Sequence, residues 1–250
     1  TEIYTLSLHD ALPISFRDSR FNLAFTGAGV SVESGLPDFR SPGGLWDRYD
    51  VAEYATLDAF RRHPDKVWVF IRELLDSYGD VRPNAGHLAL AALEAAGALH
   101  AVVTQNIDGL HQAAGSRRVV EFHGSLRRLV CLGCGRTCPS DEPSVKSVPV
   151  PRCACGRVYK PDFVFFGEAI PEAALIDAFA MARECGVLLV AGTSAEVAPA
   201  SLIPHEAKAA GATIVELNVR PTALTDSVTD HFIAGPFART MTELTRRITG

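Results

Sequence analysis

The sequence predicts an α/β fold built on a doubly wound parallel sheet, and three observations support this prediction. Apolar runs of strand length alternate along the chain with segments of helical periodicity. The run Gly186 to Ala191 is apolar throughout, as expected of a central parallel strand that is buried on both faces. Glycine-rich or polar segments directly follow several of these runs, and an open parallel sheet binds ligands at the carboxyl ends of its strands.

The composition excludes several classes of protein. The 250 residues are 47 % hydrophobic and 21 % charged, which is ordinary for a globular protein. A net charge of −5 without a long Lys/Arg run argues against direct nucleic-acid binding. No apolar run is long enough to span a membrane and no secretory signal is evident, so we expect a cytoplasmic protein.

Residues 1–15 are expected to be a non-native segment. Thr1 to Ile14 has no start Met and no helix or strand period, and it resembles the in-frame translation of a sequencing adaptor. We expect native sequence to begin near Ser15 or Phe16, and we draw no functional inference from the preceding residues.

The first predicted strand, Asn22 to Thr26, leads into the turn Gly27-Ala28-Gly29-Val30-Ser31. Two glycines allow a tight turn and a close approach of the backbone to a ligand, and the helix that follows offers free N–H groups to a phosphate. This pattern indicates a dinucleotide-binding loop. An ordinary strand-to-helix turn is the alternative, because Val32 replaces the usual third glycine. The Gly- and Pro-rich segment from Ser34 to Trp46 is expected to close over a bound cofactor.

Helical spacing marks residues 57–62, 66–78 and 85–96, and Gly97 is placed to end the last of these helices. Strands are predicted at 101–104 and 119–122, with a short helix from Leu110 between them.

Polar side chains follow both of these strands. Gln105, Asn106 and Asp108 come after the first strand, and His123 comes after the second. If the two strands are neighbours, these four side chains meet in one crevice and offer amide, carboxylate and imidazole groups. Such a mixture suits the orientation of a polar ligand and the movement of a proton. A capped turn or a structural histidine explains any one of them, but less readily all four together.

The alternation stops between Arg127 and Lys160, where cysteines occur in two tight pairs. Four thiolates suit a tetrahedral zinc ion, and the lack of a further polar ligand beside them predicts a closed, structural site. Free thiols in a loop are the alternative, and Cys138 is a spare thiol nearby. The predicted zinc ligands are Cys131, Cys134, Cys153 and Cys155.

The second half of the chain returns to the α/β pattern. A strand is predicted at 163–166, followed by a helix at 171–184 that begins with Pro171. The strand 186–191 ends in Gly192-Thr193-Ser194, a second turn able to hold phosphate or ribose oxygens. After a helix at 201–210, the strand 213–217 ends at Asn218, where a dinucleotide fold places a ribose-hydroxyl ligand that is commonly acidic. A helix at 240–248 closes the domain.

Taken together, these motifs resemble those of the sirtuins, which are NAD-dependent protein-lysine deacylases. The resemblance implies a Rossmann-like doubly wound parallel sheet, residues 16–126 and 161–250, with a small zinc-ribbon domain inserted at 127–160 together with part of the helical insertion 41–80. The segments that carry it are Gly27 to Arg40, Thr104 to His111, Phe122 to Gly124, the cysteine pairs, Phe165 to Glu168, Gly192 to Ser194 and Glu216 to Asn218.

The resemblance also implies the roles of individual residues. The NAD-binding residues would be Gly27, Ala28, Gly29, Ser31, Asp38, Phe39, Arg40, Gln105, Asn106, Ile107, Asp108, Gly192, Thr193, Ser194, Asn218 and Phe237. The acyl-lysine protein or peptide would be gripped as an added strand by Val164, Phe166, Gly167, Glu168, Ala195, Glu196 and Val197.

The implied reaction transfers the acyl group to ADP-ribose and releases nicotinamide. Asn106, Asp108 and His123 would be the catalytic residues, with His123 as the base that deprotonates a ribose hydroxyl. Zinc would hold the small domain outside the reaction, and the protein would act as a monomer. Ile71 and Leu74 are expected to form an apolar wall that disfavours acidic acyl groups.

Three other functions are weighed against deacylation. Protein mono-ADP-ribosylation would use the same NAD cleft, but the presence of His123 favours deacylation. A redox dehydrogenase is disfavoured because no second catalytic domain is evident after the last strand. A catalytically silent NAD-sensing module is disfavoured by the intact set Asn106, Asp108 and His123.

Overall fold

A computed structural model of the chain describes residues 16, 19–39, 44–141, 143 and 148–250. Six strands form a parallel sheet in the order β3-β2-β1-β7-β8-β9. This sheet confirms the predicted doubly wound α/β fold, and it makes β2 and β3 neighbours as the polar cluster requires. The strands are β1 (Asn22–Thr26), β2 (Ala101–Thr104), β3 (Val119–Glu121), β7 (Val187–Ala191), β8 (Thr213–Asn218) and β9 (His231–Ala234).

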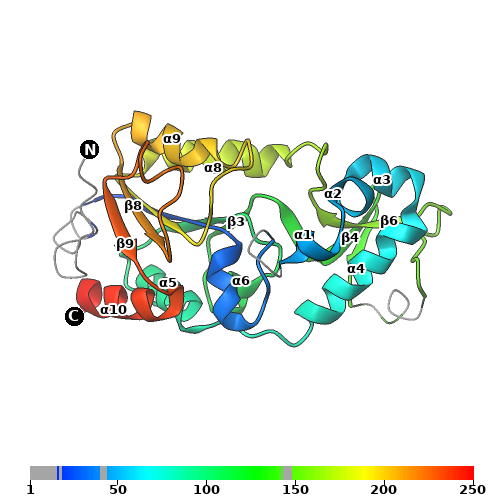
Figure 1. Ribbon diagram of the computed structural model, residues 1–250, viewed down its shortest axis with the longest axis horizontal. Coiled ribbons are helices and arrows are strands. Elements are labelled where there is room, and N and C mark those ends of the chain that lie inside the picture. Colours follow the sequence, from blue (N-terminus) through cyan, green and yellow to red (C-terminus); the bar gives the residue numbers. More distant parts are fainter. Residues whose placement is uncertain (1–15, 17–18, 40–43, 142, 144–147) are drawn as a thin grey trace.

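Helices cover both faces of this sheet (Figure 1). On one face, α8 (Glu172–Glu184) and α9 (Leu202–Ala209) pack on a core that includes Leu23 and Phe25 of β1. On the other face, α5 (Ala85–Ala95) and α10 (Phe237–Thr249) pack on a core that includes Ala24. Alternate residues of β1 therefore face opposite cores, which explains why its three central residues, 23–25, are all apolar. Within the described residues, no helix is long and apolar enough to cross a membrane.

A smaller antiparallel sheet, β5-β4-β6, lies beyond the carboxyl ends of β2 and β3. It packs through Leu126, Leu129 and Phe163 against Trp68 and Phe70 of a helical segment. The division of the chain into domains stays a prediction. The remaining elements are η1 (Ala28–Ser34), α1 (Leu45–Arg48), α2 (Val51–Tyr54), α3 (Leu57–Arg62), α4 (Pro64–Tyr78), α6 (Leu110–Ala113), β4 (Gly124–Cys131), β5 (Thr137–Pro139) and β6 (Tyr159–Phe163).

Two elements of the structure differ from the prediction. The strand predicted at 163–166 is instead β6, which ends at Phe163 and pairs with β4. Its polar sequence Tyr-Lys-Pro-Asp does not have the pattern of a strand, but the Lys160 ammonium is buried and donates to the carbonyl oxygens of Pro161 and Phe163. The helix after the glycine turn is the single 3₁₀ segment η1 rather than an α-helix, and it ends at Gly35 with φ +94°.

Candidate active site

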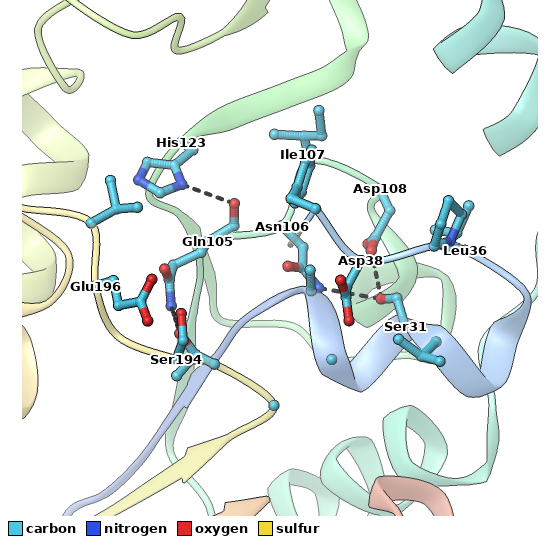
Figure 2. A pocket seen from close by; sticks show the side chains of 18 of the residues that line it. Ser31, Leu36, Asp38, Gln105, Asn106, Ile107, Asp108, His123, Ser194 and Glu196 are labelled. Carbon is cyan, nitrogen blue, oxygen red and sulfur yellow. Dashed lines mark hydrogen bonds between the residues drawn. The ribbon is translucent and has the colours of Figure 1, made fainter. Parts of the chain in front are cut away.

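A cavity of about 620 Å³ opens at the carboxyl ends of the central strands. This volume is in the range of small-molecule and cofactor sites. The cavity is lined by residues that are far apart in the sequence, and ten of them are labelled in Figure 2. The sequence-predicted residues among its lining are Ala28, Gly29, Ser31, Asp38, Phe39, Gln105, Asn106, Ile107, Asp108, His123, Val164, Phe166, Gly167, Glu168, Gly192, Thr193, Ser194, Glu196, Val197, Asn218 and Phe237.

Two described residues of the prediction, Gly27 and Ala195, are absent from the lining. The Gly27 N–H donates to the carbonyl oxygen of Ala191 at 3.1 Å. Ala195 is buried and has a φ of +51°, a strained value for a residue with a Cβ atom. Arg40 lies outside the described residues.

The glycine turn packs directly against the second turn of the sheet. Gly29 N–H donates to the carbonyl oxygen of Gly192 at 2.8 Å. A Cβ on Gly29 would lie 2.8 Å from that oxygen, and a Cβ on Gly27 would lie 2.7 Å from the Thr193 Cβ. Both glycines are therefore needed for contact between the two turns, in addition to any contact with a ligand. The two turns together form a backbone cradle at one edge of the cavity.

A hydrogen-bonded chain holds the polar residues that follow β2. Asn106 is buried, and its Nδ2 donates to the Gly27 carbonyl oxygen at 3.1 Å and to Ser31 Oγ at 3.2 Å. Ser31 Oγ donates in turn to Asp108 Oδ2 at 2.7 Å, while Asp108 Oδ1 accepts from the Leu110 N–H at 2.8 Å. This series of hydrogen bonds fixes an amide and a carboxylate side by side in the cavity wall (Figure 2).

The imidazole of His123 faces the same cavity from the end of β3. Its Nδ1 lies 3.0 Å from the carbonyl oxygen of Gln105, which can only accept, so Nδ1 carries the proton and Nε2 is left as an acceptor. Burial lowers the pKa of His123 and outweighs the opposing effect of this hydrogen bond. Since its pKa lies below the ordinary 6.5, the residue is a neutral base at physiological pH.

Two buried histidines near the polar cluster were not predicted from the sequence. The rings of His87 on α5 and His111 on α6 lie 4.9 Å apart, and both side chains are almost fully buried. Burial lowers the pKa of His87 to about 4 and that of His111 to about 3. Neither ring nitrogen of His87 has a hydrogen-bond partner within the described structure. The only signal in the sequence was a histidine at a core-facing position of each of two short apolar helices.

The segments predicted to bind substrate lie on the cavity wall. Phe166 pairs with the chain before α3, since its N–H donates to Ala55 O at 2.9 Å and its carbonyl accepts from Leu57 N–H at 3.0 Å. The turn after it is closed by Glu168, which accepts from the Phe165 N–H and forms an ion pair with buried Lys160 at 3.1 Å.

The wall beside these segments is apolar, but it differs in part from the prediction. Leu74 lines the cavity as expected. Ile71 is fully buried in the core and is absent from the lining. Phe70 and Tyr78 take its place, because positions 70, 74 and 78 follow one face of α4 at intervals of four residues.

The four predicted cysteine ligands converge at one end of the small sheet. Their Sγ atoms all lie within 4.8 Å of one another, with Cys131 and Cys155 at 3.4 Å and Cys134 and Cys153 at 3.6 Å. Four thiols at these separations fit the tetrahedral coordination of zinc. The short interval between Cys153 and Cys155 is accommodated because each of these cysteines lies opposite one from the first pair.

The chain was compared with known families, proteins and structures. A model of the Sir2 family matches residues 27–199. The chain is similar to NAD-dependent protein deacylase 2 of Pyrobaculum aerophilum, with 48 % identity over 231 residues that cover 92 % of each chain. It is similar to a solved Sir2 homolog–NAD complex with 40 % identity and a TM-score of 0.87, over 93 % of this chain and 91 % of that one. It is also similar to a solved complex of Sir2 with a p53 peptide and NAD⁺, with 33 % identity and a TM-score of 0.82 over 93 % of each chain.

Proposed function

Because the chain belongs to the Sir2 family, we infer that it is an NAD-dependent protein-lysine deacylase. The observation that carries this function is the convergence of Asn106, Asp108 and the neutral His123 on one cavity, beside a backbone cradle made by two glycine turns. Relatives that bear the name of deacylase, and a related structure that holds both NAD⁺ and a peptide, support the same function.

The proposed NAD site extends along the carboxyl edge of the sheet. The cradle of Gly27, Gly29 and Gly192 would receive the pyrophosphate, because backbone without Cβ atoms lets an anionic ligand approach closely. The adenosine would lie toward Asn218 and Phe237, and the nicotinamide toward Asp108. When bound, NAD supplies a glycosidic bond to nicotinamide whose cleavage activates the sugar for acyl transfer.

His123 is proposed as the general base of the reaction. The hydrogen bond from Nδ1 to Gln105 fixes the tautomer and aims Nε2 as the proton acceptor. Its lowered pKa keeps that acceptor available at neutral pH. Asn106 and Asp108 would hold the ribose and the carboxamide, because Ser31 and the Gly27 carbonyl lock both side chains in place.

The acyl-lysine substrate is proposed to enter as an extended strand between residues 164–168 and 195–197. Its acyl group would meet the apolar wall of Phe70, Leu74 and Tyr78. An apolar wall without a cationic partner cannot compensate a buried carboxylate, so acetyl and longer neutral acyl groups are favoured over succinyl groups.

Incubation with NAD and a panel of acetyl-, butyryl- and succinyl-lysine peptides, followed by mass spectrometry, tests this function. We expect free lysine peptide, nicotinamide and acyl-ADP-ribose in equal amounts from the neutral acyl peptides. Release of nicotinamide without acyl peptide, together with ADP-ribose attached to protein, would instead identify a mono-ADP-ribosyltransferase. Succinyl peptides should turn over more slowly than acetyl peptides.

The setting of the enzyme is also part of the proposal. We place it in the cytoplasm, because the cluster of four free thiols suits a reducing compartment and a zinc ion held by Cys131, Cys134, Cys153 and Cys155. We also propose that it acts as a monomer. Zinc would stabilise the small sheet, whereas the proton transfer is assigned to His123.

A further inference from the structure

The adenosine end of the cavity carries an arginine that the deacylase function does not use. Arg220 lines the cavity two residues after the end of β8, and its side chain is exposed. It is the only Arg or Lys among the described residues that line the cavity. Within the described part of the chain, no carboxylate forms an ion pair with it, although five acidic residues line the same cavity.

The carboxylate expected near this strand end is turned away from the cavity. Glu216 is fully buried, and its two oxygens accept hydrogen bonds from the hydroxyls of Thr222 at 2.6 Å, Thr225 at 2.8 Å and Thr229 at 2.8 Å. The strand therefore ends in the neutral Asn218, whose Nδ2 donates to the Thr193 carbonyl oxygen at 3.0 Å. No acidic side chain of β8 is left to bind a ribose hydroxyl.

The backbone on both sides of Arg220 is held in place. Before it, the Val219 N–H donates to Asn218 Oδ1 at 2.9 Å. After it, Pro221 restricts the chain, and Thr222 is fixed to both Glu216 and Thr225. The backbone that carries the guanidinium is thus anchored at the edge of the cavity, so less backbone entropy is lost when Arg220 binds a ligand.

This arrangement matches the charge pattern that selects a phosphorylated ribose. Doubly wound folds that bind NAD place an acidic residue near the ribose 2′-hydroxyl, whereas those that bind NADP place an arginine nearby. A guanidinium binds a phosphate through two parallel charge-assisted hydrogen bonds, and a carboxylate at the same place would repel it. Here the Glu216 carboxylate is withdrawn, the Glu33 carboxylate accepts a hydrogen bond from the Ala238 N–H, and Arg220 is present.

We propose that the adenosine end of this cavity accepts a ribose that bears a 2′-phosphate, as in NADP, and that Arg220 binds this phosphate. The proposal rests on the proposed function, because that function places adenosine near Asn218. It adds a second dinucleotide ligand to the site and makes Arg220 a residue that determines cofactor specificity.

Isothermal titration calorimetry with NAD and NADP on the zinc-loaded protein tests the proposal without an activity assay. For the native chain we expect the Kd of NADP to lie within about tenfold of the Kd of NAD. Arg220→Ala should raise the ratio of these two constants by about tenfold or more, because the charge-assisted hydrogen bonds are lost. Arg220→Lys should raise it less. Arg239→Ala removes an exposed arginine outside the cavity lining and should leave the ratio unchanged.

Smaller ligands identify the phosphate that is recognised. Adenosine 2′,5′-bisphosphate should bind more tightly than ADP, and raising the salt concentration should weaken its binding more than that of ADP. A preference for the 3′,5′ isomer would overturn the assignment to NADP. A native Kd for NADP more than tenfold above that for NAD, or an unchanged ratio in Arg220→Ala, would also overturn it while leaving the deacylase function intact. Failure of NAD itself to bind would instead refute the proposed function.

Discussion

From the contact between the two glycine turns, we predict that Gly29→Ala destabilises the protein. The new Cβ would lie 2.8 Å from the Gly192 carbonyl oxygen and 2.9 Å from the Gly192 Cα, whereas ordinary contacts begin at 3.4 Å. The two turns must therefore separate by about 0.6 Å, and the hydrogen bond from Gly29 N–H to that oxygen is strained. Overpacking of this kind costs about 1–3 kcal/mol of stability.

The same displacement moves the backbone cradle that is proposed to hold the pyrophosphate. Since a misplacement of about 1 Å costs roughly a hundredfold in rate, we expect a tenfold to hundredfold increase in the Kd for NAD and a similar loss of deacylation. Calorimetric titration with NAD and a urea unfolding curve measure the two effects separately.

Gly79→Ala is the matched control for this experiment. Gly79 follows α4 with φ −61°, and a Cβ there would meet nothing closer than the Leu75 carbonyl oxygen at 3.5 Å. It should leave NAD binding unchanged and raise the unfolding free energy slightly, by about 0.4–1 kcal/mol at most. If Gly29→Ala binds NAD as tightly as Gly79→Ala and unfolds at the same urea concentration, the cradle has been assigned wrongly.

Three further predictions follow from the site and its surroundings. His123→Ala should lower deacylation by about 10²–10⁴-fold while calorimetry still detects NAD binding, and undiminished turnover would exclude His123 as the base. Cys134→Ser should reduce the zinc content measured by atomic emission, whereas Cys185→Ala, outside the cluster, should not; equal zinc in both variants would contradict the proposed ligands. Burial lowers the pKa of His87 to about 4, so the folded state keeps it neutral while the unfolded chain protonates near pH 6.5. Its contribution to stability should be complete above pH 6.5 and be lost as the pH falls toward 4, by about 3 kcal/mol in all, and urea titrations should show a shallower acid loss for His87→Leu than for the native chain.

The sequence was sufficient to predict the strands of the large sheet, with the exception of β9, and the side chains that meet at its carboxyl edge. These features depend on local patterns, because a strand buried on both faces is continuously apolar and a ligand turn requires glycine. The spacing of the four cysteines likewise predicted a metal site. Asn106, Asp108 and His123 could be named together because each directly follows a predicted strand, and neighbouring parallel strands end at one edge.

Tertiary structure decided the features in which distant segments complete one another. β6 exists because β4 supplies its hydrogen bonds and because Glu168 compensates the buried Lys160, so no period in its own sequence indicated it. The wall of the cavity uses Phe70 rather than Ile71, since the rotation of α4 depends on what the helix packs against.

At the adenosine end, too, the sequence supplies the charged residues and the tertiary structure decides which of them reach the cavity. The sequence places an acidic residue, an asparagine and an arginine at the end of one strand, Glu216, Asn218 and Arg220. Only the folded chain decides which of them a ligand meets, because three threonine hydroxyls hold the carboxylate inside and leave the guanidinium at the cavity. Local periodicity determines which elements form, whereas the direction of a side chain depends on partners that the fold brings from elsewhere in the sequence.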